Sequence, residues 1–155
     1  RVGDRPVLNM GQPRTSKPMV IPSILAEGVK VVEAVINAVQ PFGYSDTAMF
    51  AVRLALDEAL ANAIRHGNQS DESKTVTIDF TVDDEQIVIS ITDQGPGFHP
   101  DQIPDPTLDE NLERPCGRGV MLMRAYMTDV YFNDSGNCVT MVKRKDCKLP
   151  QVPED

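Results

Sequence analysis

Two neighbouring segments that alternate between apolar and polar residues constrain the fold of this chain most strongly. Residues 74–82 read KTVTIDFTV and residues 86–93 read QIVISITD, with a short acidic turn at Asp83-Asp84 between them. A period of two places the apolar side chains of a β-strand on one of its faces. The two segments are therefore predicted to form a hairpin of half-buried strands.

Two helices are predicted before this hairpin and one after it. The second is capped by Ser45 and ends at the stop signal Gly67, and the third covers residues 119–127. The first runs from an N-cap at Ser23 to about Gln40. Its apolar residues recur at helical spacing and predict one buried face, formed by Leu25, Val29, Val32, Ile36 and Val39.

Further strands are predicted at both ends of the chain. Residues 17–21 favour a short edge strand, and residues 129–133 and 137–144 favour a second hairpin. The helices are not interleaved one-for-one with the strands, which favours an α+β fold. The predicted architecture is a two-layer α/β sandwich, with a mixed, mostly antiparallel sheet that carries its helices on one face.

Size and charge limit the functions that this chain can have. A length of 155 residues fits one domain, predicted over residues 17–145, with a flexible arm at 1–16 and a flexible tail at 146–155. The net charge of -8 disfavours direct nucleic-acid binding, which needs clustered Lys and Arg. The three scattered cysteines fit reduced thiols in the cytoplasm. No apolar run approaches the roughly 18 residues that span a membrane, so no membrane association is expected.

A row of polar side chains marks the end of the second predicted helix. Glu58, Asn62 and His66 are spaced four residues apart, so they lie along one face of a helix otherwise rich in alanine and leucine. A carboxylate, an amide and an imidazole in line are costly to bury without partners. The row therefore faces either solvent or a polar ligand, such as a metal ion and a phosphate chain.

Two glycine-containing motifs follow. Residues 93–98 (DQGPGF) come directly after a predicted strand, and their glycines let the backbone turn sharply and approach a ligand. Residues 117–119 (GRG) lie between a long acidic, proline-containing loop and a predicted helix, where backbone N–H groups can face an anion. Taken alone, the first motif also fits an ordinary turn, and the second also fits a flexible loop.

The order of the three motifs is more specific than any one of them: helical E-x-x-x-N, then D-x-G-x-G-F after a strand, then G-x-G before a helix. In this order they resemble the ATP-binding domain shared by gyrase, the Hsp90 chaperone, histidine kinases and MutL. The resemblance covers residues 17–144 and is strongest to the bacterial anti-sigma-factor serine kinases of partner-switching pathways. Its histidine-kinase-like ATPase fold has the element order predicted above.

The resemblance implies a site for Mg-ATP. Asn62 would bind Mg²⁺ through its side-chain oxygen, and Asp93 would accept a hydrogen bond from the adenine amino group. Glu58 would be the catalytic residue, as the general base or the group that orients the hydroxyl of a protein serine. The other nucleotide-binding positions would be Gly95, Gly97, Gly117, Arg118, Gly119, Val120, Met121 and Asn137.

Parts of the implied site separate branches of the superfamily. Residues 99–118 would form the ATP lid, and the backbone N–H groups of residues 119–121 would cradle the phosphates. Histidine kinases usually show G-x-G-L-G-L here, whereas this chain has Met121 where a glycine would stand, which favours the anti-sigma branch. The family's last strand usually carries Gly-Thr near the adenine, and Asn137 replaces that threonine.

The resemblance implies a cytoplasmic, Mg-ATP-dependent serine/threonine protein kinase that acts as an anti-sigma factor or a similar regulator. Its partners would be a STAS-type anti-anti-sigma protein as substrate and a sigma factor or other regulator, and it would form a homodimer. Two alternatives stay open. One is a nucleotide-dependent protein-interaction module without catalysis, and the other is the ATPase domain of a histidine kinase.

Overall fold

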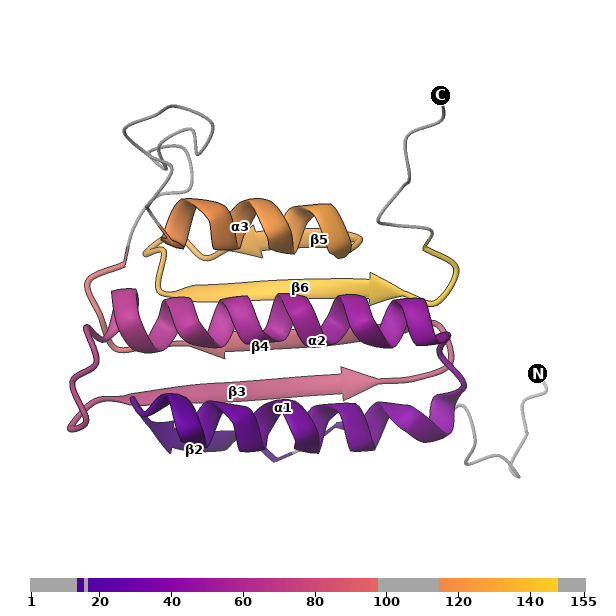
Figure 1. Ribbon diagram of the computed structural model, residues 1–155, viewed down its shortest axis with the longest axis horizontal. Helices are drawn as coiled ribbons and strands as arrows, with labels where there is room; N and C mark the ends of the chain where they lie inside the picture. The colour runs from indigo at the N-terminus through magenta and orange to yellow at the C-terminus, as the bar shows by residue number, and fades with distance from the viewer. Residues whose placement is uncertain (1–13, 16, 98–114, 148–155) are drawn as a thin grey trace.

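The computed structural model of the chain describes residues 14–15, 17–97 and 115–147 (Figure 1). In this part of the chain a β-sheet forms one layer, and three long helices lie side by side across one of its faces. The hydrophobic core lies between the layers, where aliphatic side chains of the sheet meet those of the helices. This confirms the predicted two-layer α+β sandwich.

The described sheet has six strands in the order β1-β3-β4-β6-β5, and β2 also pairs with β3. All of these pairings are antiparallel, so the described sheet is simpler than the predicted mixed one. Both β1 and β2 pair with β3, and together they form one edge. The strands are β1 (Arg14–Thr15), β2 (Met19–Pro22), β3 (Thr75–Val82), β4 (Gln86–Thr92), β5 (Asp129–Phe132) and β6 (Cys138–Arg144).

The alternating residues of β3 and β4 place one face of this hairpin in the core, as predicted. The register sets Phe80 opposite Ile89, so the two apolar rows share a face. Burying one aliphatic side chain of this size is worth about 1.5–3 kcal/mol relative to leaving it exposed. The buried members of the two rows are Val76, Ile78, Phe80, Val82, Ile87, Ile89 and Ile91.

The helical layer contains three long helices and two short turns. Ser45 caps α2 as predicted, because its hydroxyl oxygen accepts a hydrogen bond from the N–H of Ala48 at 3.1 Å. The helical elements are α1 (Leu25–Val39), the 3₁₀ turn η2 (Gln40–Phe42), α2 (Asp46–Ala61), the π-helical turn η3 (Asn62–Gly67) and α3 (Pro115–Tyr126).

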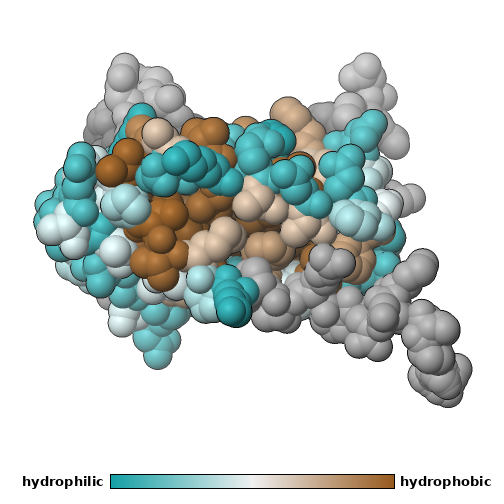
Figure 2. Space-filling view, turned by 90° about the horizontal axis from the view of Figure 1, so that it is seen from below, coloured by the Kyte–Doolittle hydropathy of each residue, from teal (hydrophilic) through white to brown (hydrophobic). Residues whose placement is uncertain are grey.

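The predicted buried face of α1 is confirmed in part, since its members Val32, Ile36 and Val39 are buried. Leu25 and Val29 are 41% and 59% exposed, whereas Val31 and Val35 are buried. Gly28 lies on the buried side of α1, where a Cβ would make an ordinary contact of 3.5 Å with Ile64 Cδ1, so this side faces the helical run of α2 and η3. The two exposed residues form an apolar patch beside β2 (Figure 2).

The predicted N-cap of α1 is also wrong. Ile24 occupies the N-cap position and makes no side-chain capping bond. Ser23 is buried instead, and its hydroxyl donates to the carbonyl oxygen of Lys74 at 2.8 Å. A contact between residues far apart in the sequence therefore replaces the local cap.

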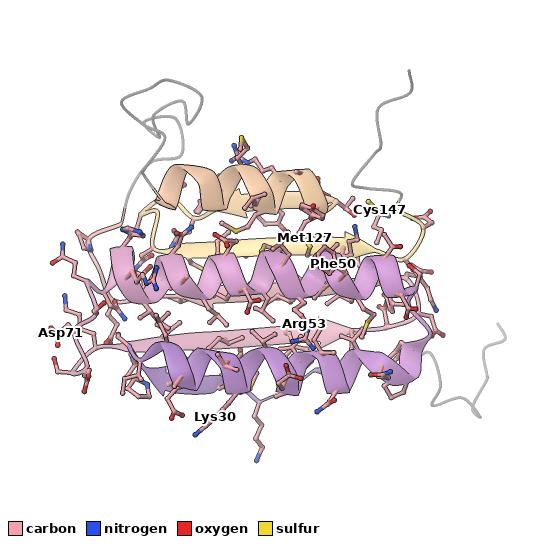
Figure 3. All side chains as sticks on the ribbon, in the orientation of Figure 1. Lys30, Phe50, Arg53, Asp71, Met127 and Cys147 are labelled. Atoms are coloured by element: carbon pink, nitrogen blue, oxygen red, sulfur yellow. The ribbon has the colours of Figure 1, made fainter. Side chains whose placement is uncertain are left out.

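Helix α2 is the central helix and contacts a helix on each side (Figure 3). Arg53 pairs with Glu33 of α1 at 2.6 Å. On the other side, the ring of Phe50 meets that of Tyr126 of α3 edge to face, with centroids 6.2 Å apart. Helix α2 and its continuation, η3, thus carry the polar row of the sequence through the middle of the helical layer.

The helical run ends at Gly67, as predicted, but for another reason. Gly67 belongs to η3, and the left-handed residues are Gln69 and Ser70, with φ of 54° and 57°. A Cβ on Gly67 would overlap the carboxylate of Asp93. This glycine is therefore needed for close approach to Asp93 and not for a left-handed helix cap.

Candidate functional site

Segments far apart in the sequence meet at one end of the molecule, on the left in Figure 1. The end of β4, the end of the run through α2 and η3, the start of α3 and the turn between β5 and β6 all lie there. The structure thereby brings together most of the predicted site residues that it describes: Asn62, Asp93, Gly95, Gly97, Gly119 and Asn137.

Asp93 directly follows β4, and its carboxylate turns back onto its own backbone. The Oδ1 atom accepts a hydrogen bond from the N–H of Gly95 at 2.8 Å. Burial raises the pKa of this carboxyl above its usual range, although the Gly95 N–H and the charge of Lys74 oppose the rise. A half-buried carboxylate with remaining acceptor capacity can recognise a hydrogen-bond donor on a ligand.

The two glycines of the DQGPGF motif are fixed by close contacts with backbone. A Cβ on Gly95 would overlap the carbonyl oxygen of Gly67, and one on Gly97 would overlap the carbonyl oxygen of Ser135. Gly97 also has a φ of +85°, in the left-handed region that L side chains avoid. The motif therefore joins the helix end and the β5–β6 turn to the end of β4.

Sequence analysis missed the residue that ties this region together, which is Asn68. It is 0% exposed, and its side-chain oxygen accepts from the N–H of Gln94 at 2.7 Å. Its amide group donates to the carbonyl of Thr75 and to the hydroxyl of Ser23, both at 2.9 Å. In the sequence Asn68 looks like an ordinary helix-ending residue, and no local signal reveals these partners.

Asn137, which replaces the usual threonine, is hydrogen-bonded to Asp93. Its carbonyl accepts from the N–H of Asp93 at 2.9 Å, and its side-chain amide donates to the carbonyl of Asp93 at 3.3 Å. Its side-chain oxygen accepts from Asn133 at 2.8 Å. These contacts show how an asparagine at this position holds the start of the Asp93 turn.

The helical side of the site is arranged differently. Glu58 and Asn62 are half-buried, and neither side chain makes a hydrogen bond with another residue that the structure describes. Gly119 lies against Asn62, because a Cβ on this glycine would be 2.6 Å from Asn62 Nδ2. His66 is exposed. Glu58 and Asn62 therefore have polar atoms available for a ligand.

The start of α3 differs from the prediction. The helix begins at Pro115 and not at Gly119, so the N–H groups of residues 119–121 belong to its second turn. The first-turn N–H groups without a partner within the helix are those of residues 116 and 117, since Pro115 has no N–H group. Val120 is buried and Met121 is exposed. Most of the predicted lid, residues 99–114, lies outside the described residues.

No cluster of three or more His, Cys, Asp or Glu side chains suited to a metal ion occurs within residues 14–15, 17–97 and 115–147. A magnesium site at Asn62 stays a prediction. Across the same residues, no helix has the length and apolar character required to traverse a bilayer.

Comparison with known proteins defines the class first. Residues 23–143 match the model of the histidine kinase-like ATPase domain. A Mycobacterium tuberculosis protein with RsbU and RsbW domains has the same fold, with a TM-score of 0.53 and 14% identity. The similarity covers 83% of this chain and 32% of that one.

Curated relatives narrow the class further. The serine-protein kinase RsbW of Bacillus licheniformis is 33% identical over 110 residues, which are 65% of this chain and 68% of that protein. An anti-sigma F factor of Clostridium perfringens is 34% identical over 99 residues, 60% of this chain and 70% of that protein. The chain therefore belongs to the histidine kinase-like ATPase family, in the branch of RsbW-type serine-protein kinases and anti-sigma factors.

Proposed function

We propose that this chain is a cytoplasmic, Mg-ATP-dependent serine/threonine protein kinase that acts as an anti-sigma factor. The observation that carries the proposal is the pair Glu58 and Asn62. They are half-buried and have no side-chain hydrogen bonds within the described part of the chain. Polar groups at such positions normally have partners, so this arrangement fits a bound metal-nucleotide and a protein hydroxyl.

The residues on both sides of the site fit ATP. Asp93 accepts a hydrogen bond from the amino group of the base, and Gly95 and Gly97 keep the neighbouring backbone free of side chains. Asn137 holds the Asp93 backbone through its hydrogen bonds. Asn62 would hold Mg²⁺ through its side-chain oxygen, and the ion would neutralise phosphate charge.

In this proposal, the start of α3 binds the phosphates. Residues 116 and 117 offer the helix's free N–H groups, and the charge of Arg118 is suited to phosphate oxygens. For the N–H groups of residues 119–121 to contact phosphate as well, the first turn of α3 must unwind when the nucleotide binds. Gly117 and Gly119 lower the free energy needed for such unwinding, since glycine weakens a helix by about 1 kcal/mol relative to alanine.

Glu58 lies on α2 four residues before Asn62, hence on the same face of the helix. In the transfer reaction its carboxylate accepts the proton of the attacking serine hydroxyl, or orients that hydroxyl towards the phosphoryl group. Phosphoryl transfer needs mainly positioning and charge neutralisation, so one carboxylate beside the metal ligand suffices.

The proposed substrate is a small STAS-type antagonist protein, and the second partner is a sigma factor or a similar regulator. The names of the relatives, serine-protein kinase and anti-sigma F factor, support a protein serine as acceptor and a sigma factor as partner. The net charge of -8 agrees with a regulator that binds proteins and not nucleic acid.

The apolar patch of Val20, Leu25 and Val29 supports a homodimer. Val20 is 60% exposed and lies on the edge strand β2, which directly precedes α1 in the chain. An exposed apolar area lies on the face shown in Figure 2. A second copy could cover this patch and pair along the same sheet edge. Val29→Glu should shift the protein from dimer to monomer in analytical ultracentrifugation, while Ala34→Glu, an exposed change elsewhere on α1, should not. A monomeric parent protein would refute the dimer.

The kinase proposal is tested with γ-labelled ATP, magnesium and extract of the source cells. The parent protein should label one small protein with acid-stable phosphate, and Glu58→Ala should reduce labelling by a factor of about 10²–10⁴ while ATP still binds. Asp57→Ala, which removes the neighbouring exposed carboxylate, is the matched control. Full labelling by Glu58→Ala would refute the assignment, and binding without any labelling would favour the non-catalytic interaction module. Acid-labile label would favour the histidine-kinase alternative.

A further inference from the structure

We propose that Asn68 is a positioning residue that fixes the base-recognising carboxylate and so sets the preference for adenine over guanine. The inference rests on the proposed role of Asp93 in nucleotide binding. Asn68 touches neither the proposed metal ligand nor Glu58 in the hydrogen-bond network of the described residues. Its effect is expected to pass through the backbone of the Asp93 turn.

Asn68 uses both functional atoms of its amide. The oxygen accepts from the N–H of Gln94, the residue directly after Asp93, at 2.7 Å. The nitrogen donates to Thr75 at the start of β3 and to Ser23, both at 2.9 Å. The side chain is 0% exposed, so losing these bonds would not be compensated readily by water. An asparagine supplies this combination of acceptor and donors, which a carboxylate or an aliphatic residue does not.

A second bond closes the connection between the turn and β3. The side-chain oxygen of Gln94 accepts from the N–H of Thr75 at 2.7 Å, so this bond joins the same two segments as the bonds of Asn68. Asp93, the residue before Gln94, is held by the β5–β6 turn, because its N–H donates to the carbonyl of Asn137. The turn is thus attached to β3, to the helix end and to the β5–β6 turn.

The position of Asn68 in the fold agrees with this role. It directly follows Gly67, whose missing side chain leaves room for the Asp93 carboxylate. Its carbonyl accepts from the N–H of Asp71, which Figure 3 labels at the same end of the molecule. One short segment therefore both makes space for the carboxylate and holds the backbone that carries it.

Base selectivity follows from the direction of the hydrogen bond. Adenine presents an amino donor where guanine presents a carbonyl oxygen, so a fixed carboxylate attracts the first and repels the second. A carboxylate free to move would lose part of both effects. The ratio of ATP affinity to GTP affinity therefore reports how well Asp93 is held.

The test measures binding of Mg-ATP and Mg-GTP by calorimetry to the full chain. Asn68→Ala should lower the ATP-to-GTP affinity ratio about tenfold, as expected when a recognition group is misplaced. Ser23→Ala is the matched control, because it removes one buried partner of Asn68 without touching the bond to Gln94. It should lower the melting temperature and leave the ratio unchanged.

The exposed Gln94 provides a second variant if Asn68→Ala does not fold. Gln94→Ala removes only the bond to Thr75 and should lower the ratio about threefold, as a partial loss of the same restraint. An unchanged ratio in whichever of these variants folds would overturn the inference. Asp93→Asn separates this failure from that of the site: if it leaves ATP affinity intact, the proposed nucleotide site itself is wrong.

Discussion

The two sides of the candidate site are organised in opposite ways. At the strand end, the turn from Asp93 to Gly97 is held by hydrogen bonds from three separate elements and by close backbone contacts. On the helical side, Glu58 and Asn62 have no side-chain hydrogen bonds within the described residues. The backbone of the strand end is held by hydrogen bonds without a ligand. On the helical side, the polar side chains have no hydrogen-bond partners within the described residues.

In the proposed kinase, this difference would separate nucleotide binding from phosphoryl transfer. A preformed base site pays little ordering entropy when the nucleotide binds. The transfer side is completed only when metal, phosphate and a protein hydroxyl supply the missing partners. We therefore expect that ATP can stay bound without rapid hydrolysis until the protein substrate arrives.

The largest effect is expected on the transfer side. Asn62→Ala should weaken binding of ATP in the presence of magnesium by about 10–100-fold, because the side-chain oxygen for the ion is lost. Binding of ATP in EDTA should match that of the parent protein. Calorimetry with and without magnesium checks this, and an equal loss in EDTA would mean that Asn62 has no metal role.

An intermediate effect is expected at Gly119. Gly119→Ala places a Cβ 2.6 Å from Asn62 Nδ2 and should displace that side chain, which lowers Mg-ATP affinity roughly tenfold. Gly28→Ala is the matched helical control, since its Cβ would make an ordinary contact of 3.5 Å with Ile64. That change should stabilise the protein by about 0.5–1 kcal/mol. Equal ATP affinity in both variants would show that the packing of α3 on Asn62 is irrelevant to binding.

The smallest effect concerns stability at the strand end. Burial raises the pKa of Asp93 in the folded protein above its value in the unfolded chain. The folded state therefore holds the proton more tightly, and this contribution to stability is lost as pH rises from the unfolded pKa, about 3.9, through the raised folded pKa. Asp93→Asn should remove that pH-dependent loss and slightly raise the melting temperature at pH 7. A lower melting temperature of the Asp93→Asn variant at pH 7 would contradict the predicted direction of the change.

Local patterns predicted the sheet well. The alternation in residues 74–82 and 86–93 gave the central hairpin, because the period of a strand is determined by neighbouring residues. The turn chemistry of residues 134–136 likewise gave the second hairpin, where Gly136 adopts a φ of +76°. The cap of α2 at Ser45 was equally local.

These local patterns did not predict contacts between segments that are distant in the sequence. Ser23 does not cap α1 as predicted, because its hydroxyl donates to the carbonyl of Lys74, 51 residues away. Leu25 and Val29 are exposed because α1 turns the opposite side, which includes Gly28, towards α2 and η3. For the site, the motif located Asp93 and its glycines, but not Asn68, whose partners come from three other segments.

Amide hydrogen exchange of the protein with and without Mg-ATP tests the contrast between the two sides most directly. The account predicts that the N–H groups of Gln94 and Gly95 are already protected without nucleotide, since both are hydrogen-bonded. Residues 116–121 should instead change strongly on binding, as the start of α3 rearranges around the phosphates. Fast exchange at Gln94 in the free protein, or an unchanged start of α3 at saturating Mg-ATP, would contradict it.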